Sequence, residues 1–324
     1  MKKLFLLAAL LVAFTSCHYK DLCYDHNHAE KSNLTLHLNL KLDLDVDLDV
    51  SVEAHTKIEI PTYLKVCFYD SLSGNLVKTE FVGPYGGPLH IMPGTYNMVV
   101  YSFDTEWTQV RGENKVNTLE AYTSDITEMK APLLANFARA KENAPGPIIY
   151  TPDHLLVTRK MVEIPPYSTD SDYTVTITAA ASTVVETYGF EVANITGIEY
   201  ISSVEAFVTN QSRSDFFGIN KKSDEPATIY FPIEVHAGDT TLHTTFNTFG
   251  KLPGESHSFL HIVMIDSEGN VYTVSEDISD QFNDAGHVIH ISDSIDIPKP
   301  ESASGGIAPT VDPWEEINHD VPIG

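Results

Sequence analysis

The chain has few basic residues for its length of 324 residues. It carries 20 Lys and Arg side chains against 45 Asp and Glu, so its formal net charge is −25 at pH 7. Such a surface repels the phosphate backbones of DNA and RNA. The charge balance therefore argues against nucleic acid as a partner, while a hydrophobic content of 42% indicates a folded protein with an acidic, solubilising surface.

The sequence also contains none of the short motifs that carry common enzyme chemistry. There is no G-x-S-x-G, no H-E-x-x-H, no phosphate-binding P-loop and no EF-hand spacing. Carboxylates are abundant, but acid–base catalysis needs a geometry that a sequence does not supply. We therefore expect no enzyme activity, no catalytic residues, no cofactor and no metal site. A secreted hydrolase is the rival class, and it would need a cleft with clustered carboxylates.

Long apolar runs are absent except at the start, "MKKLFLLAALLVAFTSC". Its core, Leu4 to Phe14, follows two lysines and is too short to span a bilayer. With the small residues before Cys17, the segment resembles a bacterial lipoprotein signal. That resemblance implies a signal peptide at 1–16, a lipid on Cys17 and the lipid bilayer as a partner. We expect an outer membrane lipoprotein at the periplasmic face or cell surface; an ordinary secretory signal is the alternative.

Cysteine is scarce, with three in the chain. Residues 17–33 contain Cys23 and three histidines, but they lack the paired C-x-x-C of common zinc sites, so we expect a solvated tether. Cys67 lies in the apolar strand pattern "YLKVCFY". A disulfide between Cys23 and Cys67 and a buried free thiol at Cys67 both remain open.

The most regular feature is "LTLHLNLKLDLDVDLDV", residues 34–50. Alternation of apolar and polar residues predicts a half-buried strand, with Leu36, Leu38, Leu40 and Leu42 on one face. The aspartates at 43, 45, 47 and 49 occupy the other face. They lie ~6.6 Å apart, too far for one ion to take more than one or two of them. A membrane barrel would need many such runs, and this is the only one of its length and purity. We expect the opening strand of a soluble sheet, bent or partly unpaired because of its length.

Short strand patterns separated by Gly- and Pro-containing turns fill the rest of the chain. The segment 124–146 differs, because its apolar residues fit a short helix beginning near Pro132. The sequence predicts a mainly β fold of two tandem antiparallel β-sandwiches, 34–155 and 156–298, with this helix between strands of the first.

Several stretches, in order, carry a family resemblance: "CHYKDLCYDH", "MPGTYNMVVYSFDTEW", "IIYTPDHLLV", "VEAFVTNQ" and "VDPWEEI". Together with the lipoprotein signal, they resemble a family of uncharacterised lipoproteins of Gram-negative anaerobes grouped with the fimbrillins and fimbrial anchor proteins. The resemblance implies two transthyretin-like sandwiches and a role in pili or surface adhesion through strand exchange with fimbrial subunits. It implies no catalytic residues.

Aromatic residues offer a second interpretation. Tyr200, Phe216, Phe217 and Trp107 stand in stretches that could be loops, as in β-sandwich lipoproteins that bind glycans. Core packing is the simpler interpretation for each of them. An exposed aromatic platform would favour a glycan as partner, whereas a vacant strand groove or an exchangeable terminal strand would favour the fimbrial role.

The C-terminal residues 299–324 combine a linker rich in Pro, Gly and Ser with the acidic segment "VDPWEEINHDVPI". Disordered segments are poor in aromatic residues, so Trp314 and Ile317 are candidate docking residues. The segment is expected to dock on its own second domain or to add to a neighbour's sheet.

Overall fold

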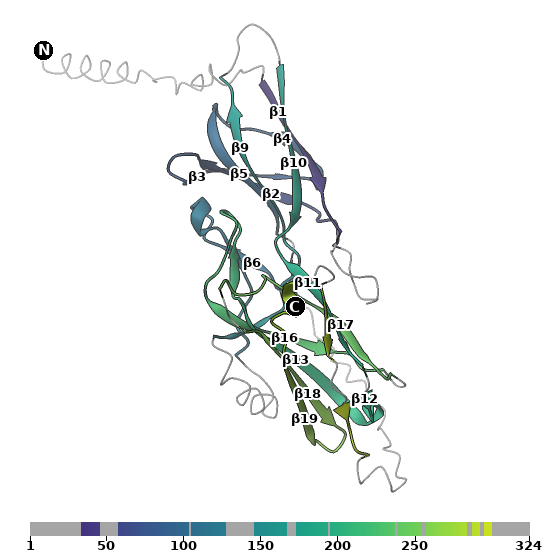
Figure 1. Cartoon of the computed structure of the whole chain (residues 1–324). Coiled ribbons are helices and arrows are strands. Elements are labelled where there is room, and N and C mark those ends of the chain that lie inside the picture. Colours follow the sequence, from purple (N-terminus) through teal and green to yellow (C-terminus); the bar gives the residue numbers. More distant parts are fainter. Residues whose placement is uncertain are drawn as a thin grey trace, which may run out of the picture.

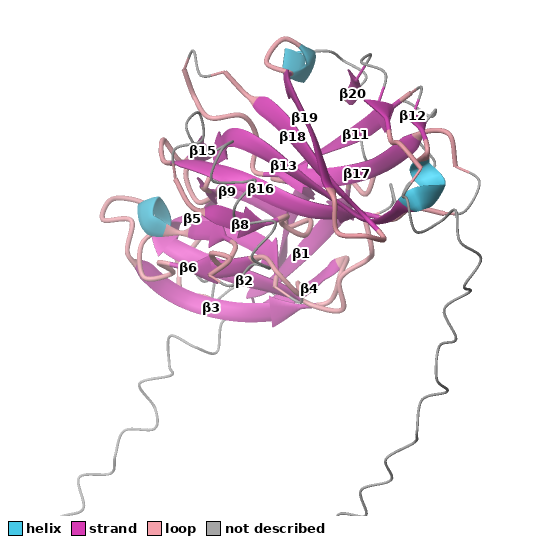
Figure 2. Ribbon diagram, turned by 90° about the horizontal axis from the view of Figure 1, so that it is seen from below, coloured by secondary structure: helices cyan, strands magenta, loops and turns pink. Residues whose placement is uncertain are grey.

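The computed structural model shows a mainly β protein with two lobes along one long axis (Figure 1). No α-helix occurs in the part of the chain that is described; the helical elements there are the short 3-10 turns η2 (Val116–Thr118), η4 (Ile198–Tyr200) and η5 (Gln281–Asn283) (Figure 2). The expected helix falls largely in residues 128–145, outside the described residues. Within the same part, no helix is long and apolar enough to cross a membrane. The structure describes residues 34–45, 58–103, 105–127, 146–166, 173–193, 195–236, 239–254, 257–283, 287–291 and 295–299.

The first lobe is one seven-stranded sheet that folds over on itself. Strand β10 pairs with β9 through only two residue pairs, Ser182↔Val157 and Thr183↔Leu156, so β10, β1 and β4 can turn over the other four strands. The strand order is β3-β2-β5-β9-β10-β1-β4. Its members are β1 (Leu34–Leu42), β2 (Leu64–Asp70), β3 (Leu76–Val82), β4 (Gly86–Leu89), β5 (Gly94–Ser102), β9 (Leu156–Ile164) and β10 (Tyr173–Thr183).

A hydrophobic core fills the space between these two layers. Leu38, Leu40 and Ile177 contribute from one layer, and Phe68 and Met98 from the other. In β1 the side chains of Leu38 and Leu40 are 0% and 3% exposed, while the odd-numbered residues from 37 to 45 are exposed. The alternation predicted a one-faced strand, and the described part of the run has that arrangement. Asp47 and Asp49 lie outside the described residues.

The second lobe is a sandwich of further sheets. Its larger sheet has the order β19-β18-β13-β16-β8, and its core-facing partner has the order β17-β11-β20. Phe190, Phe231 and Ile262 lie in the core between them. The strands are β8 (Ile148–Tyr150), β11 (Glu186–Val192), β13 (Ile201–Ser212), β16 (Pro226–Ile233), β17 (Leu242–Thr248), β18 (Phe259–Asp266), β19 (Val271–Asp277) and β20 (Val288–Ile291), with β12 (Ile195–Thr196) and β21 (Ile295–Asp296) as a small pair.

The sequence predicted purely antiparallel sheets, and the observed strand pairing shows that this prediction is wrong. The pairs β1–β10, β8–β16, β11–β20 and β12–β21 are parallel. Strands far apart in the sequence form these pairs, so no tight hairpin forces an antiparallel direction. The sheets are therefore mixed, although hairpin-connected neighbours such as β2 and β3 are antiparallel.

A third core joins the lobes. The face of β2, β5 and β9 that points away from the first core carries Cys67, Tyr69 and Tyr101, all 0–1% exposed. Against them packs a four-stranded sheet, β15-β14-β7-β6, and Phe217 from its β14–β15 connection, whose ring meets that of Tyr101 edge-on at 5.1 Å. Its strands are β6 (Gln109–Arg111), β7 (Glu120–Tyr122), β14 (Ser214–Phe216) and β15 (Lys221–Lys222).

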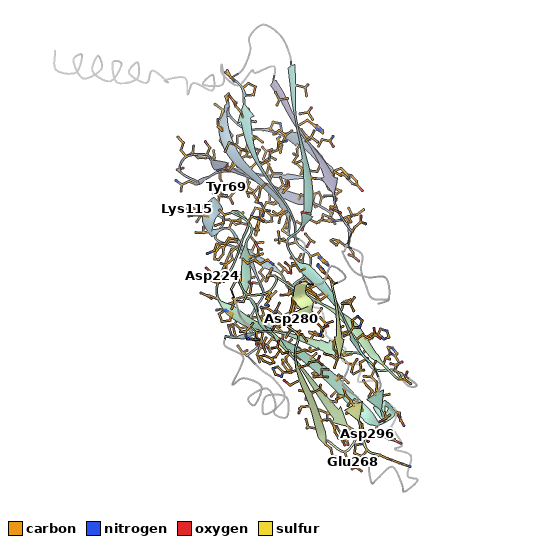
Figure 3. All side chains as sticks on the ribbon, viewed as in Figure 1. Tyr69, Lys115, Asp224, Glu268, Asp280 and Asp296 are labelled. Atoms are coloured by element: carbon orange, nitrogen blue, oxygen red, sulfur yellow. The ribbon has the colours of Figure 1, made fainter. Side chains whose placement is uncertain are left out.

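The loop between β6 and β7 reinforces this junction. The Leu76 N–H donates to the Asn114 carbonyl and the Val116 N–H to the Gly74 carbonyl, each at 2.9 Å. Figure 3 shows Lys115 of this loop close to Tyr69 of β2. Backbone hydrogen bonds thus tie the joining sheet to the β2–β3 hairpin, in addition to the apolar contacts.

Strand pairing does not follow the expected division at residue 155. Strands β9 and β10 lie in the first sheet, whereas β8 pairs with β16 and β7 with β14. The described strands therefore place three passages between the lobes, from β5 to β6, from β8 to β9 and from β10 to β11. The division into two independent domains stays a prediction, but neither sandwich is built from one continuous segment.

The joining core can be tested with two adjacent phenylalanines. Phe217 is fully buried, while Phe216 is only half-buried. We expect Phe217→Ala to lower the free energy of unfolding by about 3–5 kcal/mol, because it leaves a cavity between the lobes. Phe216→Ala should cost clearly less in the same urea titration. Equal losses would show that Phe217 does not hold the lobes together.

Candidate functional site

The first candidate site is the position of β1 between β10 and β4, which we call the β1 seat. Nine residue pairs, from Leu34↔Tyr173 to Leu42↔Ala181, join β1 to β10. Four pairs join it to β4. Gly86 of β4 has φ +97°, and a Cβ there would lie 2.1 Å from the Leu38 carbonyl oxygen. Glycine is therefore required where β4 closes over β1.

The structure places only some of the predicted site residues. Leu38 and Leu40 point into the core of the seat, Leu42 is half-buried, and Leu36 pairs through its backbone with Val175 and Leu89. Cys17, Trp314 and Ile317 lie outside the described residues, as does Cys23. Cys67 is buried and free, and burial raises the pKa of its thiol.

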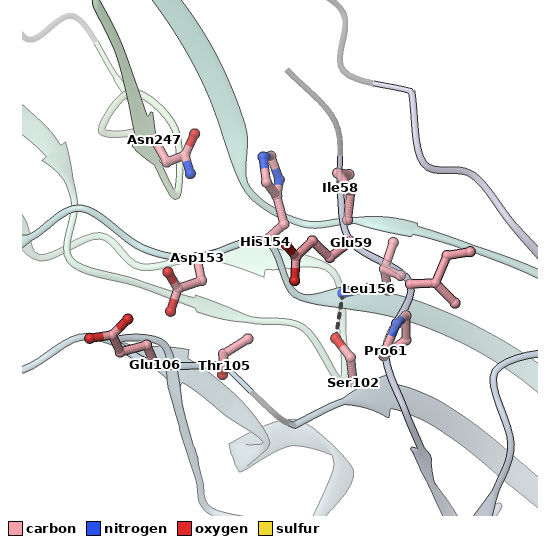
Figure 4. Close-up of a pocket in the computed structure, with 11 residues that line it drawn as sticks. Ile58, Glu59, Pro61, Ser102, Thr105, Glu106, Asp153, His154, Leu156 and Asn247 are labelled. Carbon is pink, nitrogen blue, oxygen red and sulfur yellow. Dashed lines mark hydrogen bonds between the residues drawn. The ribbon is translucent and has the colours of Figure 1, made fainter. Parts of the chain in front are cut away.

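The second candidate site is a cavity of about 400 Å³ between the lobes, which we call the interlobe pocket (Figure 4). Three segments of the first lobe and its connections meet there with β17 of the second lobe. Figure 4 shows the carboxylates of Glu59, Glu106 and Asp153 around the same opening as Asn247 and His154. The lining residues are Ile58, Glu59, Ile60, Pro61, Ser102, Thr105, Glu106, Asp153, His154, Leu156 and Asn247.

One wall of the pocket is held by a chain of hydrogen bonds. His154 Nε2 lies 3.2 Å from Thr187 Oγ1, which donates to Asn247 Oδ1 at 2.8 Å. The Asn247 Nδ2 group donates to the Pro152 carbonyl at 2.9 Å. His154 Nδ1 lies 3.0 Å from the Thr183 hydroxyl. Both imidazole nitrogens are therefore engaged by threonines, and burial lowers the pKa of His154, which favours the neutral ring.

Asp153 fixes the loop on the opposite wall. Its Oδ2 accepts hydrogen bonds from the Trp107 N–H at 2.5 Å and the Thr108 N–H at 3.2 Å. The Thr108 hydroxyl donates to the Asp153 carbonyl at 2.9 Å. The indole of Trp107 stacks on Tyr150, with ring centroids 4.6 Å apart and planes 30° apart. The exposed Trp107 is thus stacked on the half-buried Tyr150 beside the pocket-lining residue Glu106.

These groups do not form a catalytic relay. The Ser102 hydroxyl oxygen accepts from the Leu156 N–H at 3.0 Å, and neither nitrogen of His154 bonds to it. A nucleophile needs an adjacent base that a third group orients. Among the described residues, no group of three or more His, Cys, Asp or Glu could hold a metal ion. The pocket is built for hydrogen bonding.

The four aromatic residues that the sequence suggested for glycan binding differ in their solvent exposure. Phe217 is 0% exposed and belongs to the joining core, in agreement with the simpler interpretation of core packing. Phe216 and Tyr200 are half-buried. Trp107 is 41% exposed and is the one candidate of the four on the surface.

A charged cluster lies at the third passage between the lobes. Arg159 of β9 donates to the Phe217 carbonyl and to Asn220 Oδ1, both at 2.7 Å. Lys222 pairs with Glu186 across the same cavity. Asp215 is 6% exposed, and its Oδ1 has no hydrogen-bond partner. Burial outweighs the attraction of Lys222 and Arg159 and raises the pKa of Asp215 to about 6.

This cluster predicts a pH dependence of stability. Because the folded pKa of Asp215 lies above its unfolded value of 3.8, the folded state binds the proton more tightly, and stability from this group falls as pH rises from about 4 to 6. The Asp215→Asn variant should gain up to about 3 kcal/mol in free energy of unfolding at pH 7 and little at pH 4, since one pKa unit is about 1.4 kcal/mol. Urea titrations at both pH values measure this difference.

The exposed Asp45 provides the matched control. Asp45→Asn should change the free energy of unfolding little at either pH, because an exposed carboxylate loses no hydration on folding. A gain for Asp215→Asn that is the same at pH 4 and pH 7 would contradict the raised pKa.

Sequence reasoning missed most of the pocket residues. Asp153 and His154 stand inside "IIYTPDHLLV", and Trp107 ends "MPGTYNMVVYSFDTEW", two stretches already noted for resemblance. No short spacing connects them, because 46 residues separate Trp107 from Asp153. Arg159 and Asp215 likewise meet only through the joining of the lobes.

The fold places the protein in a class of elongated, mainly β proteins with two joined lobes. In this chain the first described strand, β1, lies in the sheet of one lobe. The chain belongs to the family described as Domain of unknown function (DUF5119), whose profile matches residues 16–232. A curated protein of Bacteroides ovatus, named "Putative fimbrium anchoring subunit Fim4B", is 25% identical over 195 residues. This match covers 60% of the chain and 53% of that protein, so the chain spans about half the length of the curated relative it matches.

One solved structure shows a similar fold. A Bacteroides ovatus protein described as a "putative adhesin" has a TM-score of 0.60 at 22% identity, over 88% of this chain and 98% of that one. The fimbrial anchor protein Mfa2 from Porphyromonas gingivalis has a TM-score of 0.44 at 14% identity, over 79% of this chain and 88% of that one. The predicted resemblance to fimbrial anchor proteins is confirmed by the family match and the curated relative.

Proposed function

We propose that the chain is a membrane-anchored, non-enzymatic fimbrillin-like lipoprotein that anchors or assembles pili, or mediates surface adhesion, through β-strand exchange. Its similarity to a curated fimbrium anchoring subunit supports the pilus role. In this proposal the lipid on Cys17 holds the protein on the outer membrane, and the two lobes correspond to the tandem transthyretin-like sandwiches that the resemblance implies.

The observation that carries the strand-exchange part is the β1 seat. β1 is the first described strand, so it can leave the sheet without unthreading any later strand. It is held by β10, by four residues of β4, and by Leu38 and Leu40 in the core. Withdrawing it would expose a groove with free backbone groups on both sides, which a strand of similar alternation from a fimbrial subunit could fill.

The membrane anchor is tested first. The Cys17→Ala variant should leave the membrane fraction, because the covalent lipid is the anchor in this proposal. Sedimentation of intact and mutant protein, with labelled fatty acid, measures both attachment and lipidation. Continued sedimentation of the variant with undiminished label would exclude Cys17 as the anchor.

The seat itself is tested by a buried and an exposed position of the same strand. Leu40→Asp should lower the free energy of unfolding by several kcal/mol, because it places an unpaired charge in an apolar layer. Asn39→Asp is the matched control, since residue 39 is exposed and should tolerate the charge. Similar changes in thermal midpoint for both variants would contradict a one-faced strand in the seat.

The pilus role is tested by crosslinking in intact cells followed by mass spectrometry of captured neighbours. Fimbrial subunits should crosslink to the wild-type protein through residues flanking the seat, such as those at the β4 edge. Their absence from the captured proteins, with the protein present at the surface, would refute the assembly role.

A further inference from the structure

Trp107 combines exposure with a fixed orientation. It is 41% exposed, yet its indole stacks on Tyr150 and its backbone N–H is held by the Asp153 carboxylate. A large aromatic side chain gains nothing in stability from the part that stays in water, although single exposed residues do occur on folded proteins. The orientation is therefore prepared before any ligand arrives, which lowers the entropy cost of binding.

The adjoining interlobe pocket has the size of a small-molecule site. Its volume of about 400 Å³ lies within the range of ~300–1,000 Å³ for such sites. Three carboxylates, an amide and a threonine hydroxyl line it together with apolar groups of Ile58, Ile60 and Pro61. The lining is more polar than apolar, so convergent polar groups rather than apolar walls would fix the orientation of a ligand.

The polar groups specify what the ligand must offer. Ionised Glu59, Glu106 and Asp153 only accept hydrogen bonds, so the ligand must donate several of them. The carboxylates and the net charge of −25 repel anions such as phosphates and acidic polysaccharides. Asp153 already accepts two backbone N–H groups. The Thr105 hydroxyl donates to the Thr108 carbonyl, which leaves its oxygen as a neutral acceptor, and Asn247 keeps one amide N–H after its bonds with Thr187 and Pro152. This mixed set suits neutral hydroxyl groups better than a strongly cationic ligand.

We propose that the interlobe pocket and the adjacent Trp107–Tyr150 pair form a binding site for a neutral oligosaccharide. One sugar ring lies in the pocket, where its hydroxyls donate to Glu106 and Asp153. A neighbouring ring places its apolar C–H face on the indole of Trp107. This site adjoins the end of the β1 seat, where Leu42 packs against the cluster of Ile58 and Leu156, but the binding of a sugar does not depend on the pilus role.

The two tryptophans of the chain make the test direct. In the full mature chain carrying Trp314→Phe, Trp107 is the remaining tryptophan and reports on its own surroundings. Neutral oligosaccharides ending in glucose, galactose, mannose or N-acetylglucosamine are titrated to about 10 mM, because shallow saccharide sites bind weakly and 1 mM corresponds to only about −4 kcal/mol. At least one should shift the tryptophan emission saturably, and calorimetry should give the same affinity.

Variants then locate the binding, with calorimetry as the readout. Trp107→Ala should weaken it by about tenfold or more, as expected for a central aromatic contact. Glu106→Gln keeps the shape but removes the charge, and it should also weaken binding. Tyr85→Ala is the control, because Tyr85 is 61% exposed and does not line the pocket. Circular dichroism confirms that each variant is folded.

Three results would overturn the proposal. The first is the absence of saturable binding by every oligosaccharide in the panel. The second is binding that Trp107→Ala and Glu106→Gln leave unchanged. The third is binding of a lysine-rich peptide through the same residues while the sugars fail, which would make the pocket a site for a cationic partner. None of these results bears on whether Cys17 or the β1 seat serves pilus assembly.

Discussion

The structure depends on one layer of strands that is buried on both faces. Val66 and Phe68 of β2 point into the core of the first sandwich, while Cys67 and Tyr69 point into the joining core. All four are fully buried. Burial of apolar surface stabilises a fold by about 25 cal/mol per Å², so both faces of this layer contribute to the stability of the first lobe. The same layer gives the second lobe a surface to pack against.

This shared layer explains why the chain crosses between the lobes three times. A sheet face with Tyr69 and Tyr101 must be covered, and the joining sheet that covers it takes β6 and β7 from the first half of the sequence and β14 and β15 from the second. Each crossing leaves backbone and polar side chains at the boundary. The interlobe pocket and the Asp215 cavity lie at these crossings, because polar groups gather where the apolar layers end.

A feature of this fold could be predicted from the sequence only where the interacting residues lie close together in the chain. The one-faced strand β1 was predictable, because alternation is a local property of the chain. "VCFY" in β2 was recognisable as a strand, but its continuous apolar run could not show what covers each face. Phe217 was expected to pack in a core, but no local pattern could show which core, since its partner Tyr101 lies 116 residues away in the sequence. Asp153 and Trp107 also meet through tertiary contacts that no local pattern records.

The two candidate sites differ in a way that follows from this architecture. The β1 seat is closed by backbone pairing with β10 and β4 and by two leucines, and β1 takes no part in the joining core. Strands β2, β5 and β9 cannot leave the sheet without breaking both cores, whereas β1 contributes to only one large core. Exchange of β1 would therefore leave the joining core intact, but it would take Leu42 away from the small cluster that contains Ile58 and Leu156, two residues that line the interlobe pocket. The β1 seat and the interlobe pocket are thus linked through this one apolar cluster.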